Sequence, residues 1–95
     1  MARILWRASA RDDLRQILTF IARENPAASR RLRTVIERAV LSAALHPKLF
    51  RHSDRVPGLR EIVAHPNYIV LYRAADGGIE VVSVVHSRRE FPPQP

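Results

Sequence analysis

The stretch YIVLYRAADGGIEVVSVVH, residues 68–86, decides the fold. Residues 68–73 are apolar on both alternating faces, as in a strand that is covered on both sides. Residues 79–86 form a second apolar run of strand length. Between the two runs, Gly77 and Gly78 can take the positive φ that a hairpin turn requires. The stretch therefore predicts an antiparallel hairpin in which residues 68–73 form a central strand.

Two further strands are predicted upstream of this hairpin. Leu59–Ala64 is joined to it by the turn His65-Pro66-Asn67 and follows a basic loop over residues 47–58. Arg3–Arg7 is a short apolar run near the N-terminus that also suits a strand. The predicted sheet thus has four strands.

Two helices are predicted between the first strand and the loop. Ser9 with Asp12 three residues later indicates a helix start of the capping-box type. Asn25 followed by Pro26 indicates the start of a second helix, which runs to about Leu45. The short connection predicts an antiparallel helix hairpin. The order is β-α-α-β-β-β, an α+β fold in which the hairpin packs on one face of a small, mainly antiparallel sheet, as a single domain over residues 1–95.

Composition narrows the class of partner. The 95 residues carry a net charge of +7, and Lys48 is the only lysine, so the basic charge is almost entirely arginine. This balance suggests nucleic acid or an acidic protein as partner, unless it reflects codon usage alone. The absence of cysteine excludes disulfides and thiolate zinc sites. With no signal peptide and no apolar run of transmembrane length, we expect a cytoplasmic protein without a membrane partner.

The candidate catalytic residues lie at one predicted end of the sheet. Strand alternation lets Arg60, His86, Arg88 and Arg89 converge there. In a ribonuclease, the arginines would bind phosphate and His86 would transfer a proton. The alternative is that Arg60 forms a surface ion pair and His86 ends a strand. No tyrosine, lysine or second histidine is expected beside His86, which leaves the second proton-transfer role unfilled.

Other chemistry finds less support in the sequence. The four histidines lie in separate predicted elements without metal-ligand spacing, so neither a metal nor a cofactor is expected. Tyr68 and Tyr72 share one face of the central strand, where they could stack on bases but more often belong to a core.

Several segments together resemble the RelE/ParE toxin superfamily. They are WRASARDDL (6–14), ENPAA (24–28), PGLRE (57–61), HPNYIVLYR (65–73) and VVHSRREFP (84–92). The resemblance covers nearly the whole chain and agrees with the predicted element order. It implies the toxin of a bacterial type II toxin–antitoxin module, a class also described as plasmid stabilisation proteins.

Within this superfamily the resemblance is greater to ParE than to RelE. RelE-like members cut mRNA on the ribosome, whereas ParE-like members are regarded as inhibitors of DNA gyrase. Phe91 stands where a terminal tyrosine is often found, and the lysine-rich patch of RelE-like enzymes is absent. The resemblance therefore implies a non-enzymatic gyrase inhibitor. We expect it to bind its target through His86, Arg88, Arg89 and Phe91, since aromatic and arginine groups dominate many interfaces. The alternative is a metal-independent mRNA endoribonuclease that uses Arg60, His86 and Arg88.

The resemblance also implies a cognate ParD-like antitoxin, encoded by an adjacent gene. Such a partner would wrap an acidic, flexible segment around the basic toxin and would alone contact operator DNA. We expect its helix to lie across the predicted helix hairpin, on a surface made by Leu14, Leu18, Arg31 and Val35.

Overall fold

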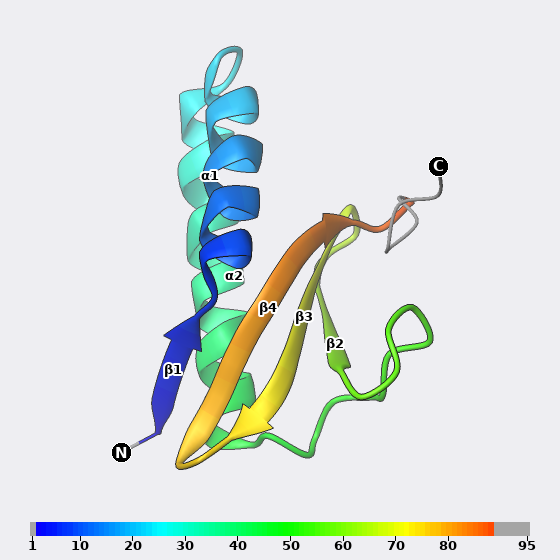
Figure 1. Cartoon of the computed structure of the whole chain (residues 1–95). Helices are drawn as coiled ribbons and strands as arrows, with labels where there is room; N and C mark the ends of the chain where they lie inside the picture. The colour runs from blue at the N-terminus through cyan, green and yellow to red at the C-terminus, as the bar shows by residue number, and fades with distance from the viewer. Residues whose placement is uncertain (1, 89–95) are drawn as a thin grey trace.

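The computed structural model describes residues 2–88 and has six elements (Figure 1). In chain order they are β1 (Arg3–Trp6), α1 (Ala8–Ala22), α2 (Pro26–Leu45), β2 (Arg60–His65), β3 (Tyr68–Ala75) and β4 (Gly78–His86). This order confirms the predicted α+β fold. Neither helix combines the length and the apolar character that crossing a membrane requires.

The sheet has the strand order β1-β4-β3-β2. β2, β3 and β4 are antiparallel neighbours, whereas β1 pairs with β4 in parallel. β3 is central, as its two apolar faces predicted. The turn between β3 and β4 contains Gly77 at a φ of +73°, which confirms the expected glycine turn.

The two helix starts differ in how well local sequence predicts them. Asn25 caps α2, since its side chain accepts a hydrogen bond from the Ala28 amide at 3.0 Å, and Pro26 is the first helical residue. The prediction for α1 is wrong, because its N-cap is Arg7 and no side chain caps it. Ser9 lies inside the helix and its hydroxyl donates to the Val82 carbonyl at 2.9 Å.

α1 also closes the edge of β4 beyond the end of β1. β1 pairs with β4 only as far as Trp6 opposite Val81. Further along, Asp13 of α1 accepts hydrogen bonds from the Ser83 hydroxyl at 2.7 Å and from the Val84 amide at 3.0 Å. The side chains of a helix therefore satisfy polar groups that an edge strand would otherwise expose.

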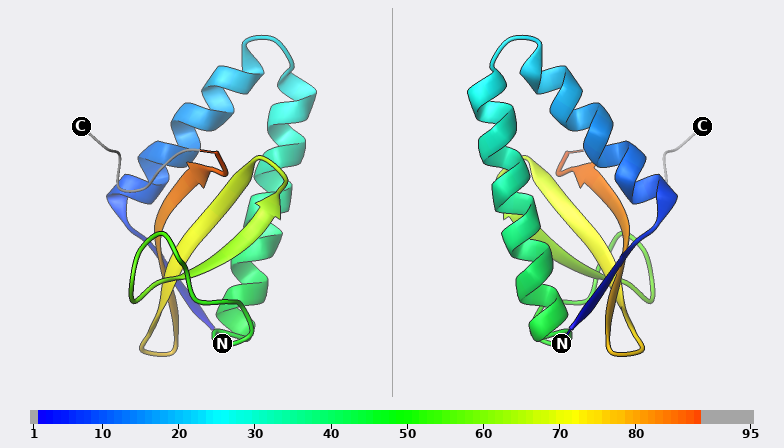
Figure 2. Two further views of the ribbon diagram at one scale, coloured as in Figure 1. Left: turned by 90° about the vertical axis from the view of Figure 1, so that its right-hand side faces the viewer. Right: turned by 90° about the vertical axis from the view of Figure 1, so that its left-hand side faces the viewer.

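The sheet buries apolar side chains on both faces. The helix hairpin covers one face (Figure 2), where Ile36, Val70 and Tyr72 are among the buried residues. Leu59 and Leu71 are buried on the other face, with Val56 of the preceding loop packed against them. A bulge in β4 places Leu71 opposite Ser83 and Tyr72 opposite Val81. It shifts the side-chain alternation, so that Val82 and Val84 pack on opposite faces rather than together.

Glu80 on β4 carries a pH-dependent contribution to stability. Its carboxylate accepts hydrogen bonds from Arg7 at 3.1 Å and from Arg73 at 2.6 Å, and these hold its pKa below the ordinary value of 4.5. The contribution is present above that ordinary value and is lost as the pH falls through the lowered one. Glu80→Gln should therefore flatten the fall of the thermal midpoint on acidification, in a melting series from neutral pH down to about pH 3. Glu24→Gln, on the α1–α2 turn, is the control, and equal slopes in both variants would contradict the assignment.

Candidate functional site

Arg60 and His86 lie at opposite ends of the sheet, so their predicted convergence is wrong. Arg60 begins β2 and pairs with Tyr72, whereas His86 ends β4 and pairs with Tyr68. β2 and β4 are both antiparallel to β3 and so run in the same direction. Arg60 lies opposite Tyr72 and His86 lies opposite Tyr68, so the two residues are four β3 residues, about 13 Å, apart along the strands at the usual rise per residue, with β3 between them. Strand alternation predicts on which face of the sheet a side chain lies, but it does not predict at which end of the sheet the residue lies.

Of the other residues predicted to lie at the end of the last strand, one is among the described residues and two lie outside them. Arg88 is the second residue after β4 and is exposed, with its backbone amide 3.2 Å from His86 Nδ1. Arg89 and Phe91, expected to contact the target, lie outside the described residues. The described part of this end therefore consists of His86, Arg88 and their neighbours on β3.

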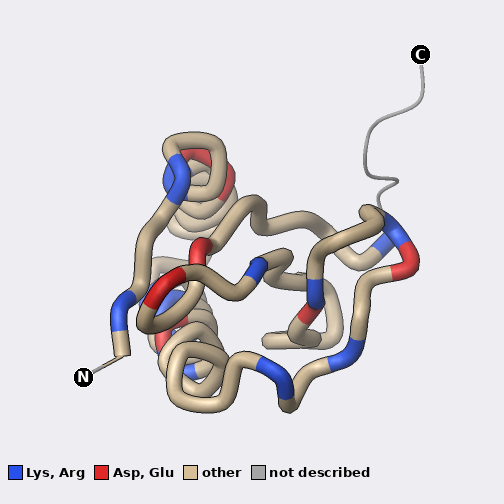
Figure 3. Tube along the Cα trace, turned by 60° about the horizontal axis from the view of Figure 1, so that its bottom comes forward, with Lys and Arg blue, Asp and Glu red and all other residues tan. Residues whose placement is uncertain are grey.

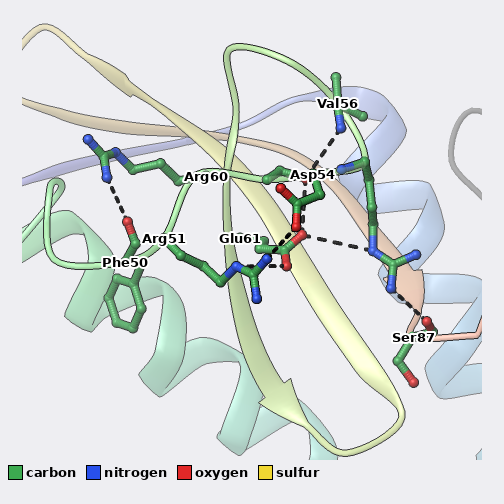
Figure 4. Close-up of polar contacts among 9 residues, drawn as sticks. Phe50, Arg51, Asp54, Val56, Arg60, Glu61 and Ser87 are labelled. Carbon is green, nitrogen blue, oxygen red and sulfur yellow. Dashed lines mark hydrogen bonds and ion pairs between the residues drawn. The ribbon is translucent and has the colours of Figure 1, made fainter.

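Arg60 holds the segment that follows α2. Its Nη1 donates to the Phe50 carbonyl at 2.6 Å (Figure 4). The same Nη1 lies 3.4 Å from the Lys48 carbonyl, to which it also donates. On β3, the Tyr72 hydroxyl donates to the Pro47 carbonyl at 2.8 Å. Burial raises the pKa of Tyr72, and the nearby Arg60 charge opposes that rise. The two side chains thus fasten residues 47–50 to the sheet.

A second polar cluster, the Glu61 clamp, consists of Arg51, Ser53, Arg55 and Glu61. The Glu61 side chain is only 7% exposed and accepts a hydrogen bond from the Ser53 hydroxyl at 3.0 Å. Arg51 Nε lies 3.5 Å and Arg55 Nε 3.9 Å from its carboxylate oxygens (Figure 4). Because both oxygens have a partner, Glu61 is engaged in structure and is not free to act as a general base.

The clamp also joins the loop to the end of β4. Ser53 Oγ accepts from the backbone amides of Arg55 at 3.0 Å and Val56 at 3.3 Å. Arg55 Nη2 donates to the Ser87 carbonyl at 2.7 Å. Glu61 follows Arg60 directly on β2, and the sequence gives no sign of this cluster, because only the fold brings the loop residue Ser53 and the Ser87 carbonyl into it.

Three rings gather at the end of β4 and form the sheet-end cluster, His65, Tyr68 and His86. The Tyr68 ring centroid is 5.3 Å from that of His86 and 5.9 Å from that of His65. Nδ1 of His65 accepts from the Asn67 amide at 3.0 Å, just as Nδ1 of His86 accepts from Arg88. Nε2 therefore carries the proton in a neutral ring of either histidine. The expectation that His86 has no tyrosine or histidine beside it is wrong, because the turn at Pro66 folds β2 back onto β3.

The four residues expected to bind the antitoxin helix line two surfaces. Leu14 and Leu18 line a groove of about 760 Å³ between α1, α2 and β1, with Ile4 and Trp6 also in its wall. Leu18 is only 6% exposed, so it belongs to the core as well.

Arg31 and Val35 lie on the exposed side of α2, in a separate hollow of about 470 Å³. Val35 directly precedes the fully buried Ile36, and successive helical residues point about 100° apart. The groove and the exposed side of α2 are therefore two different surfaces. Figure 2 shows the two helices diverging from the turn that joins them, with β1 at the open end of the hairpin.

Both hairpin surfaces are basic. Within residues 2–88, six arginines of the hairpin region have no side-chain hydrogen bond or ion pair, and Figure 3 shows basic positions along both helices and the loop. They are Arg11, Arg23, Arg30, Arg31, Arg33 and Arg38. Arg11, Arg15 and Arg33 border the groove, together with Glu37. Unpaired guanidinium groups beside an apolar groove suit an acidic partner with apolar side chains.

Fold and surfaces together define a class of protein: a small, basic α+β domain with an open groove beside its helix hairpin. Over residues 2–88, no group of three His, Asp or Glu side chains is placed to hold a metal ion. The family model for the ParE toxin of the type II toxin–antitoxin system parDE matches residues 4–91. Toxin RelE2 of Caulobacter vibrioides is 33% identical over 89 residues, which are 94% of this chain and 99% of that protein.

A solved structure shares the fold. A chain of the chromosomal ParDE toxin–antitoxin system from P. aeruginosa superposes with a TM-score of 0.75, at 19% identity, over 90% of this chain and 96% of that chain. The chain belongs to the ParE/RelE family of type II toxin–antitoxin toxins.

Proposed function

We propose that this toxin is ParE-like, that it inhibits DNA gyrase by binding it, and that a ParD-like antitoxin neutralises it. The observation that carries the proposal is the separation of Arg60 from His86, by about 13 Å along the strands and by the width of β3 across them. Cleavage of RNA through its 2′-hydroxyl needs a base, an acid and a cation around one phosphate. Arg60 is too far away to serve a phosphate that reaches His86.

The antitoxin part of the proposal rests on the groove. Its apolar wall includes Leu14 and Trp6, and Arg11 and Arg33 border it without side-chain partners among residues 2–88. An acidic, flexible segment gains both apolar burial and charge pairing when it folds in such a groove. Operator DNA would then be contacted through the antitoxin, and the basic hairpin would be covered in the complex.

The gyrase part of the proposal assigns target binding to the end of β4. His86, Arg88, Arg89 and Phe91 combine aromatic and guanidinium groups, which dominate many protein interfaces. A chain that ends at Ser87 should therefore lose most of its inhibition of gyrase, while His86→Ala should keep it within a few fold.

A ribosome-dependent mRNA endoribonuclease is the second candidate, and the sheet-end cluster favours it. Two imidazoles whose ring centroids each lie within 6 Å of the Tyr68 ring supply, with its phenol, groups able to give and take protons. This candidate places catalysis at His86 and Tyr68, with Arg88 as the nearest arginine beyond the strand.

Parallel assays of the purified toxin separate the two candidates. We expect stabilised gyrase–DNA cleavage and no ribosome-dependent cleavage of mRNA. Loss of a working general acid or base costs about 10²–10⁴ in rate, so a ribonuclease would fail after His86→Ala. Cleavage of mRNA that disappears in His86→Ala or Arg60→Ala would overturn the gyrase proposal.

The antitoxin part of the proposal is tested separately, by co-purification of the toxin with the product of the adjacent gene. A toxin that does not bind this product would contradict the antitoxin part.

A further inference from the structure

A second concave site lies beside α1, at the end of the sheet away from Arg60. This Phe20 hollow, of about 320 Å³, is lined by residues that include Asp13, Gln16, Phe20, Tyr68 and His86. Its volume is at the lower end of the range of small-molecule sites, about 300–1,000 Å³. It therefore suits one flat ring system better than a helix or a strand of a partner.

Aromatic surface is the first property of the hollow. Phe20 is 71% exposed, the most exposed large apolar side chain among residues 2–88. Across the hollow, Tyr68 is half-buried and packs edge-on against His86. An exposed phenyl ring and a tyrosine ring held by His86, both lining one hollow, offer the stacking surfaces that unpaired bases use.

Polar groups in the hollow match the edge of a base. His86 Nδ1 accepts from the Arg88 amide, so Nε2 is left as a hydrogen-bond donor. Asp13 uses Oδ2 for Ser83 and Val84, and its Oδ1 makes no hydrogen bond with the described residues. The Gln16 amide is exposed and offers both a donor and an acceptor. The aromatic surface is thus bordered by a donor on His86, an acceptor on Asp13 and the Gln16 amide, which can donate and accept.

Arginine side chains of α1 and of the turn after it lie beside the hollow. A neighbouring hollow of about 330 Å³ shares Gln16 and Phe20 with the first and is also lined by Arg15 and Arg23. Arg15 pairs with Asp12 at 2.6 Å, whereas Arg23 has no side-chain partner among the described residues. Phe20 thus stands between a polar aromatic hollow and an unpaired guanidinium group. Aromatic rings interleaved with arginine are typical of single-stranded nucleic-acid sites.

We propose that the Phe20 hollow binds one unpaired base of a nucleic-acid strand, with the adjoining phosphate held by Arg23. An aromatic side chain of a partner protein would fill the same space, but it would leave Asp13 Oδ1 and the Gln16 amide without a ring-edge partner and Arg23 without an anion. The hollow lies apart from the antitoxin groove and shares His86 with the surface proposed to bind gyrase, but the inference rests on the lining of the hollow and not on gyrase as the target.

The test is fluorescence anisotropy of the full-length toxin with labelled single-stranded hexaadenylate, as RNA and as DNA, at physiological salt. Phe20→Ala should weaken binding about 5- to 150-fold, the usual cost of removing one stacking ring. Arg23→Gln should reduce the slope of log affinity against log salt by about 0.7. Leu49→Ala, at a site 69% exposed outside the hollow, should leave binding within about twofold. The RNA and DNA arms show which strand is preferred.

Three results would overturn the inference. The first is no binding of either oligonucleotide. The second is equal binding by Phe20→Ala and Leu49→Ala, which would mean that charge alone attracts the strand. The third is Phe20-dependent binding of an acidic tryptophan-containing peptide with no Phe20-dependent binding of the oligonucleotides, which would make the hollow a protein contact.

Discussion

Gly78→Ala is expected to lower the free energy of unfolding by at least about 3 kcal/mol. A Cβ atom at Gly78 would lie 1.8 Å from the backbone oxygen of Arg3. Gly78 is the residue opposite Arg3 in the register of β1 and β4, so the clash is between two backbones. No rotamer change relieves it, and β1 must move away from the sheet. Ile4 and Trp6 would move with β1, and the groove would lose part of its wall.

Gly58→Ala is the matched control for this prediction. Gly58 has a φ of +87° and no atom within 4 Å of an added Cβ, so this variant measures backbone strain alone. That strain costs about 1–2 kcal/mol. Urea unfolding of both variants gives the comparison, with the fluorescence of Trp6 as a probe inside β1. Equal losses in the two variants would show that β1 does not pair with β4 at this position.

Elements whose signals are local could be predicted from the sequence. The Asn25-Pro26 pair marks the start of α2 because the cap needs only the next three residues. The two apolar faces of residues 68–73 predict a central strand because burial on both sides leaves no polar face. These signals, taken in order, were enough for the α+β fold.

Features that depend on long-range pairing could not be predicted in the same way. Ser9 has the sequence context of a helix cap, but the free edge of β4 offers its hydroxyl a carbonyl 73 residues away. Tyr68 comes to lie beside His86 only through the register of β3 and β4. Arg60 and His86 are residue types suited to one site. They lie at opposite ends of the sheet, however, because β2 and β4 run in the same direction and Arg60 begins one while His86 ends the other. The candidate site was therefore predicted in its residue types and only partly in its arrangement.

The two surfaces of the hairpin predict a ranking of charge-reversal variants. Arg11→Glu with Arg33→Glu places two negative charges beside the groove, whereas Arg31→Glu with Arg38→Glu places the same two on the exposed side of α2. None of the four arginines has a side-chain partner among residues 2–88, so neither double variant breaks a bond within the toxin. The two variants have the same net charge and differ only in where it lies.

Antitoxin binding should weaken at least about tenfold in the groove variant and by less than about threefold in the other, because like charges opposed at an interface are costly and distant ones are screened. Titration calorimetry with the purified antitoxin at two salt concentrations measures both. The loss in the groove variant should shrink at high salt, since it is electrostatic. The opposite ranking would move the antitoxin helix to the side of α2 that carries Arg31 and Val35. Equal losses would mean that the total charge of the hairpin, rather than its groove, attracts the partner.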